Sequence, residues 1–121
     1  MTTAAAIIRL ARPAHWIKNI IVLFPVIFAM RAGDVSAWRS AGLATAAFCL
    51  VSSAVYIFND ILDRNADRLH PKKKDRPLAS GRIGVGPAAV AAICLAAAGL
   101  ATAFAVNNIL PVIAVFYLLL Q

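Results

Sequence analysis

The sequence predicts an all-α, multi-pass transmembrane helical bundle, because its composition leaves few polar residues to cover a water-facing surface. Hydrophobic residues make up 62% of the 121 positions and charged residues 14%, and the mean hydropathy is +0.81. Soluble domains are about half apolar and about a quarter charged. Two uncharged runs, residues 40–59 and 83–121, reach the roughly 20 residues that a helix needs to cross a bilayer core of about 30 Å.

The first expected span begins near Pro13. Only twelve residues separate Lys18 from Arg31, which is too few to cross, so the helix has to start earlier and draws Lys18 into its first turns. An ionisable side chain at that depth either extends back to the interface or faces a polar cavity. Residues 4–14 resemble a short interfacial helix, with Arg9 at the lipid headgroups.

The remaining spans follow from the two uncharged runs. Residues 40–59 form the second span and residues 85–106 the third, and a turn at Asn107 leads to a fourth that begins near Ile109. The third span carries small residues every three or four positions, which lets helices approach closely; the alternative is an alanine-rich run without a special neighbour. These small residues are Ala88, Ala92, Ala96 and Gly99.

The fourth span has only thirteen residues, about 20 Å. We therefore expect residues 1–121, a single membrane domain of about four helices, to be the N-terminal part of a larger protein.

Basic residues set the expected orientation. Seven of the twelve Lys and Arg residues lie in residues 64–82, whereas the turn at Asn107 has none. Because cytoplasmic segments of membrane proteins are enriched in Lys and Arg, we expect the N-terminus and the loop 61–84 on the cytoplasmic side of the cell (plasma or inner) membrane. The same bias accounts for the net charge of +7, so nucleic acid is not expected as a partner, whereas membrane lipid and phosphorylated ligands are.

The most informative segment lies where the second span leaves the membrane. If the helix continues, Asp60, Asp63 and Asp67 project within about 60° of one another, with Tyr56 on the same side. Carboxylates at this spacing repel one another, so a cation is expected over this face. Arg64 is one candidate, as a purely structural partner of Asp60 and Asp67. A divalent metal is the other, because a few hard oxygen ligands suit Mg²⁺, which completes its shell with water and substrate phosphate.

A basic loop follows the carboxylates. Pro71 and Pro77 interrupt any helix, and five Lys or Arg side chains lie in residues 72–82. Acidic groups for a metal beside basic groups for phosphate suit a magnesium–diphosphate. The lysine run at 72–74, taken alone, equally fits a role in membrane topology, whereas Arg76 is expected to contact phosphate.

Together these residues resemble a known family. The segment Asn59-Asp60-x-x-Asp63-x-x-x-Asp67-Arg68, followed by DRPLASG at residues 75–81, resembles the first Asp-rich motif of the UbiA superfamily of intramembrane prenyltransferases. Residues 12–19, RPAHWIKN, look like the first-helix signature of that family. The Trp-Ile-Lys-Asn form, with His-Pro after the acids, is most similar to the decaprenyl-phosphate phosphoribosyltransferase branch.

The resemblance implies a bundle of about nine helices around a lipid-open cavity, in which two Asp-rich motifs hold Mg²⁺ and a diphosphate. It implies catalytic roles for Asp60, Asp63 and Lys18, and metal binding by Asp60, Asp63 and Asp67. The substrate-binding residues that it implies are Arg76, Asn59, Asn19, Lys73 and Tyr56. The second motif would lie beyond Gln121, so residues 1–121 alone are expected to be inactive.

Two reactions and one non-catalytic role stay open. In the first reaction, phosphoribose passes from phosphoribosyl pyrophosphate to a polyprenyl phosphate, and Mg²⁺ neutralises the pyrophosphate leaving group. In the second, a prenyl diphosphate alkylates an aromatic acceptor. The non-catalytic alternative is a membrane module such as a transporter fragment. Transporters more often carry ionisable residues near the midplane of their helices, whereas every Asp here except Asp34 lies at the end expected to be cytoplasmic.

Overall fold

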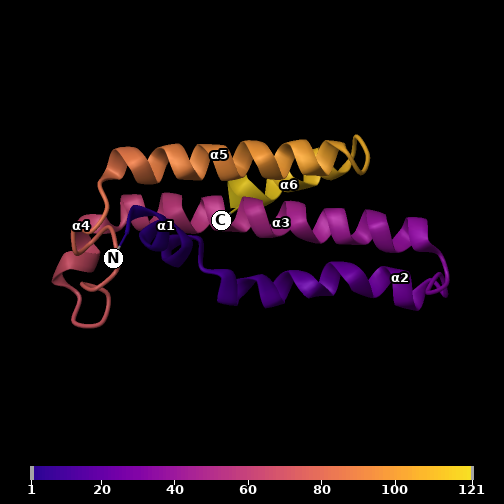
Figure 1. The fold of residues 1–121 in the computed structure, drawn as a ribbon, viewed down its shortest axis with the longest axis horizontal. Coiled ribbons are helices and arrows are strands. Elements are labelled where there is room, and N and C mark those ends of the chain that lie inside the picture. Colours follow the sequence, from indigo (N-terminus) through magenta and orange to yellow (C-terminus); the bar gives the residue numbers. More distant parts are fainter. Residues whose placement is uncertain (1, 121) are drawn as a thin grey trace.

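The longest helix forms the axis of the molecule. The computed structural model describes residues 2–120, which form an elongated bundle of helices without a strand in that range (Figure 1). The axis is α3, Val35–Leu62, about 42 Å long at 1.5 Å per residue. Asp34 caps its start, because its Oδ1 accepts hydrogen bonds from the backbone N–H groups of Ser36 (2.9 Å) and Ala37 (3.2 Å). The bond from Ala37, followed by the ion pair with Arg31, lowers the pKa of Asp34.

The first expected span is a 3₁₀ helix that continues as a short α-helix. η1, Pro13–Leu23, leads into α2, Phe24–Phe28, and the two run antiparallel to α3 (Figure 1). The start at Pro13 confirms the prediction. Because a 3₁₀ helix rises about 2.0 Å per residue, the two pieces together reach about 30 Å, which the same number of α-helical residues would not.

The third expected span, α5, Val85–Phe104, packs along α3 through its small residues. Ala88, Ala92 and Gly99 are buried, as the small-residue pattern predicts, and Ala96 is half-buried. A Cβ atom at Gly99 would lie 2.7 Å from Cγ2 of Val51. Glycine therefore sets how closely these two helices approach.

The fourth expected span is α6, Leu110–Leu120. Oδ1 of Asn107 accepts hydrogen bonds from the backbone N–H groups of Ile109 (2.9 Å) and Leu110 (2.8 Å), so the turn forms at the predicted asparagine. Gln121 lies outside the described residues. By length and composition, α3 and α5 are the two described helices able to cross a membrane, and Pro13–Phe28 and α6 are shorter apolar helices.

The N-terminal helix α1, Thr3–Ala11, is shorter than the predicted 4–14. It ends because Arg12 adopts a left-handed backbone conformation (φ 50°, ψ 59°) and Pro13 follows. Its apolar side belongs to the protein core, since Ala6 and Leu10 are buried in one cluster with residues of α3, α5 and the preceding loop. The helices α1 and α4, Arg64–Leu69, and the loop between α4 and α5 gather at one end of the bundle (Figure 1).

Candidate functional site

Two carboxylates are buried at the end of the bundle where α3 meets α4. Asp60, in the last turn of α3, and Asp67, in α4, are each 3% exposed. Nη1 of Arg76 lies 3.2 Å from Oδ1 of Asp60 and 2.7 Å from Oδ2 of Asp67. One guanidinium group from the loop therefore joins both acids.

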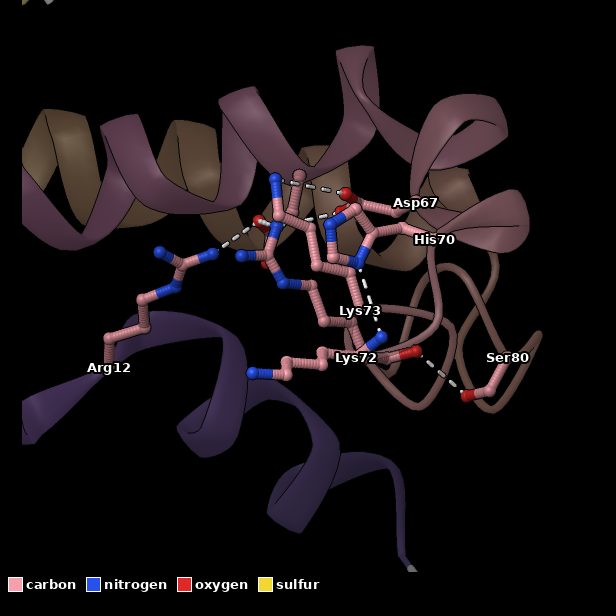
Figure 2. Close-up of polar contacts among 8 residues, drawn as sticks. Arg12, Asp67, His70, Lys72, Lys73 and Ser80 are labelled. Carbon is pink, nitrogen blue, oxygen red and sulfur yellow. Dashed lines mark hydrogen bonds and ion pairs between the residues drawn. The ribbon is translucent and has the colours of Figure 1, made fainter.

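Two further cations complete the cluster. Arg12 donates a hydrogen bond to the same Oδ1 of Asp60, and its guanidinium carbon lies 5.1 Å from the centre of the Tyr56 ring. Nζ of Lys73 lies 3.7 Å from Oδ1 of Asp67. Figure 2 shows Arg12 reaching the cluster from the N-terminal segment, and Lys73 reaching it from the loop. The negative charge of the two buried acids is thus balanced from two segments that are distant in sequence.

Ser53 anchors the turn that carries Arg12. Its Oγ donates a hydrogen bond to the backbone carbonyl of Ala11 (2.8 Å) and accepts one from Nε1 of Trp16 (2.9 Å). Ser53 is fully buried in α3. The chain before Arg12, at Ala11, and after it, at Trp16, is therefore hydrogen-bonded to α3, the helix that carries Asp60.

Arg64 is not among the cations paired with the two acids, so the expected choice of Arg64 as their structural partner is wrong. In the described part of the chain, the ion pairs of Asp60 and Asp67 are made by Arg12, Lys73 and Arg76. Nε of Arg64 is instead buried without a hydrogen-bond partner. Helical spacing suggested a neighbour in sequence, but the tertiary fold supplies cations from other segments.

Asp63 departs from the predicted face of three carboxylates. It is exposed, whereas Asp60 and Asp67 are buried. Within residues 2–120, no three His, Cys, Asp or Glu side chains lie close enough together to hold a metal ion. Asp63 is exposed because three positions along a helix rotate a side chain by about 60°. At the rim of a bundle, that rotation separates a buried position from an exposed one.

The donor set that remains is two buried carboxylates. This set fits Mg²⁺ held by one or two carboxylates, with waters and substrate phosphates completing its octahedral shell. It does not fit a cage made of protein ligands alone. Of the three predicted acids, Asp60 and Asp67 are the buried pair that would hold such an ion, whereas Asp63 is exposed.

A basic pocket of about 300 Å³ opens beside Asp60. Four cationic side chains and two carboxylates line it, together with one histidine and one proline. These residues are Arg9, Arg12, Lys72, Arg76, Asp60, Asp75, His15 and Pro77. An excess of cations around a buried carboxylate suits a ligand that brings phosphate groups and a metal ion together.

An inner polar pocket of about 270 Å³ adjoins the basic pocket through their shared residue His15. Its other lining residues are Lys18, Asn19, Ser52, Tyr56 and Tyr117. Nδ2 of Asn19 lies 3.4 Å from Oγ of Ser52, and the His15 ring packs edge-on against Tyr56 at 5.2 Å. Lys18 is exposed and lines this pocket, as the alternative of a polar cavity predicts.

Asn59 does not join the other predicted site residues. It lines an apolar pocket of about 510 Å³ between α3, α5 and α6. Adjacent residues of an α-helix point about 100° apart, so Asn59 and Asp60 lie on different faces of α3. The predicted substrate contact of Asn59 therefore lies away from the basic pocket.

Arg12 and His15 are site residues that the sequence indicated only as part of a motif. The available signal was Arg12-Pro13, since a residue before proline avoids the α conformation and ends a helix. A helix that ends there leaves Arg12 at a bend, where its side chain projects toward a neighbouring element. The partner, Asp60, lies forty-eight residues away and could not be inferred from spacing.

Comparisons with known proteins identify the family of this chain. The model of the UbiA prenyltransferase family matches residues 20–121. The chain is 35% identical to a decaprenyl-phosphate phosphoribosyltransferase of Mycobacterium tuberculosis, over 97% of this chain and 40% of the relative. A protein of that name from Mycolicibacterium smegmatis is also 35% identical, over 97% of this chain and 38% of the relative. A 4-hydroxybenzoate octaprenyltransferase of Acidovorax ebreus is 33% identical, over 74% of this chain and 30% of the relative.

The chain thus spans about 40% of the length of the mycobacterial relatives. The family match covers most of the residues described above, including both buried carboxylates and the basic loop. It also accounts for an all-helical, strongly apolar chain, since the family consists of multi-pass membrane helical bundles. The chain belongs to the UbiA prenyltransferase family.

Proposed function

We propose that the full-length gene product is a magnesium-dependent intramembrane transferase that moves phosphoribose from phosphoribosyl pyrophosphate to a polyprenyl phosphate. The observation that carries the proposal is the basic pocket, in which four Lys or Arg side chains surround the buried carboxylate of Asp60. The names of the mycobacterial relatives support this choice of donor. The orientation that goes with it places the N-terminus and the loop 61–84 on the cytoplasmic side.

The donor binds at the end of the bundle. Asp60 and Asp67 would hold the metal ion, and Asp63 would add a carboxylate at the exposed rim. When bound, Mg²⁺ supplies positive charge that stabilises the pyrophosphate leaving group. Arg76 binds the phosphates through its planar guanidinium group, and Lys73 adds a second cation.

The acceptor phosphate lies in the inner polar pocket. Lys18 gives it a positive charge, while Asn19 and Tyr56 offer hydrogen bonds. The two pockets share His15, so the two substrates meet at a common wall. There the bond between C1 of the ribose and the pyrophosphate oxygen breaks, and a lipid phosphate oxygen bonds to C1. Holding both reactants in contact is the main contribution of these residues to the rate.

A second candidate function keeps the same donor pocket. The Acidovorax relative is named for prenyl transfer to 4-hydroxybenzoate, and a prenyl diphosphate carries the same diphosphate group. The alternative is that a prenyl diphosphate binds at Asp60 and Arg76 and alkylates an aromatic acceptor.

One experiment separates the two. The full-length gene product, purified in nanodiscs, is incubated with labelled phosphoribosyl pyrophosphate and polyprenyl phosphate, or with labelled prenyl diphosphate and 4-hydroxybenzoate, with and without EDTA. We expect label to pass into lipid only in the first mixture and only without EDTA. Transfer to the aromatic acceptor instead would select the second function, and no transfer in either mixture would count against both.

A further inference from the structure

We propose that Arg12 is an exchangeable counter-ion: it holds Asp60 until the donor binds, and then moves onto a phosphate of the donor. The inference rests on the proposed function and deepens it, because it gives Arg12 a role in donor binding. It starts from a contrast between the two guanidinium groups that contact Asp60.

Arg12 and Arg76 contact the same oxygen of Asp60 but are not equally held. Arg76 also lies 2.7 Å from Oδ2 of Asp67, so a second buried acid fixes it. In the described residues, Asp60 is the one carboxylate that Arg12 contacts. If Arg12 leaves, Asp60 keeps Arg76; if Arg76 leaves, both acids lose a partner. Arg12 is therefore the cation that can be exchanged at lower cost.

The surroundings of Arg12 allow its side chain to move while its backbone stays fixed. The backbone is tied down on both sides by Ser53, through the carbonyl of Ala11 and the indole of Trp16. The side chain is 25% exposed and lines the basic pocket. The guanidinium group also lies against the Tyr56 ring, whose face stabilises a cation outside the ion pair.

Charge gives the exchange its direction. Three cations already balance Asp60 and Asp67. A divalent ion at these carboxylates adds two positive charges and would repel a guanidinium group that stayed on Oδ1. A guanidinium group that leaves Asp60 finds a phosphate in the same pocket, and its two parallel N–H donors match phosphate geometry.

The exchange predicts that substitution of Arg12 changes the affinities for two ligands in opposite directions. Loss of a merely structural residue would not produce this pattern. In the full-length gene product in nanodiscs, titration calorimetry measures Mg²⁺ alone, and then phosphoribosyl pyrophosphate at saturating Mg²⁺. For Arg12→Gln we expect Mg²⁺ alone to bind about threefold to tenfold more tightly, because a competing cation is gone, and the donor to bind about tenfold more weakly. Arg82→Gln is the control, since Arg82 lies in the loop between α4 and α5, is exposed and does not line the basic pocket; neither affinity should change.

Arg12→Lys tests the same idea with the charge kept. An ammonium group still competes with Mg²⁺ but lacks the planar fork, so Mg²⁺ should bind as to the wild type while the donor binds about threefold or more weakly. Arg12→Lys decides the outcome if Arg12→Gln does not fold. Affinities for the two ligands that fall together, or a donor affinity unchanged in both variants, would overturn the role of Arg12. A wild type that binds no diphosphate with Mg²⁺ would instead overturn the proposed function.

Discussion

Arg76 and Asp67 are nine residues apart in the sequence, and 2.7 Å separates their Nη1 and Oδ2 atoms. The same nitrogen reaches Asp60, so one side chain connects the basic loop to both α3 and α4. Seven positions, about two helical turns, separate the two acids, yet the helix is interrupted between them at Asp63. The relative placement of α3 and α4 therefore depends on this ion pair as well as on the backbone.

Replacing Arg76 by alanine should lower the stability of this end of the bundle. Asp60 and Asp67 would be left with less positive charge in a buried setting, although Arg12 and Lys73 remain. We expect a loss of about 2 kcal/mol in the free energy of unfolding, less than the roughly 3–5 kcal/mol for a fully buried pair, because the Arg76 side chain is partly exposed and two other cations remain. Thermal unfolding in detergent, followed by circular dichroism, measures it, with Arg82→Ala as the control from the same loop. A variant as stable as Arg82→Ala would contradict the bridging role.

Asp60→Asn and Asp63→Asn should separate stability from metal-dependent activity. Both carboxylates belong to the proposed acidic set, so both variants should lose magnesium-dependent transfer in the full-length protein. Only Asp60 is buried and paired, so Asp60→Asn should also lower the free energy of unfolding by about 2 kcal/mol, while Asp63→Asn stays within about 0.5 kcal/mol. Transfer assays and unfolding curves on the same preparations measure both. Normal transfer by Asp63→Asn would remove it from the site.

Gly99→Ala tests the close contact between α3 and α5. The new Cβ would lie 2.7 Å from Cγ2 of Val51 and 3.1 Å from the carbonyl oxygen of Ala47, so the helices have to separate. We expect a loss of about 1–3 kcal/mol in unfolding free energy. Gly42→Ala is the matched control: it lies within α3 and has nothing within 4 Å of its Cβ position, so alanine should stabilise the helix by up to about 1 kcal/mol. Equal effects of the two substitutions would argue against the packing shown in Figure 1.

Ser53→Ala should loosen the turn that carries Arg12. The carbonyl of the buried Ala11 and the indole N–H of the partly exposed Trp16 would both lose a partner; the buried carbonyl alone costs about 1–3 kcal/mol. In a Trp38→Phe background, the fluorescence of Trp16 should shift toward longer wavelength as the indole meets more water. Ser40→Ala, at an exposed position of α3, is the control. An unchanged emission spectrum would show that the Ser53 hydroxyl does not hold this turn.

Patterns along the sequence predicted the helices well. The start of the first span at Pro13, the turn at Asn107 and the packing of Ala88, Ala92 and Gly99 are all present. Each depends on a local property, such as the fixed φ of proline, the side-chain oxygen of asparagine or the lack of a large side chain. The family resemblance, drawn from the motifs at residues 12–19, 59–68 and 75–81, is also confirmed.

The residues of the site were predicted in part. Lys18, Asn19 and Tyr56, all expected to bind or act on substrate, lie at one pocket, and Arg76 lines the pocket beside Asp60. Asn59 and Asp63 lie elsewhere, because one or three positions along a helix turn a side chain out of a face that only packing defines. The proposed role of Asp63 remains for the Asp63→Asn variant to test.

By itself, the sequence determined the apolar character of the helices, the position of the turns and the presence of acids and cations at one end. Those features depend on the conformational preferences of residues that are close in the sequence, and these preferences do not depend on the tertiary structure. Only the tertiary structure decided which cation balances which acid: Arg12 and Arg76 rather than Arg64 for Asp60. The physical reason is that a buried carboxylate binds the cation that packing brings within reach, and distance along the chain has no fixed relation to distance in space.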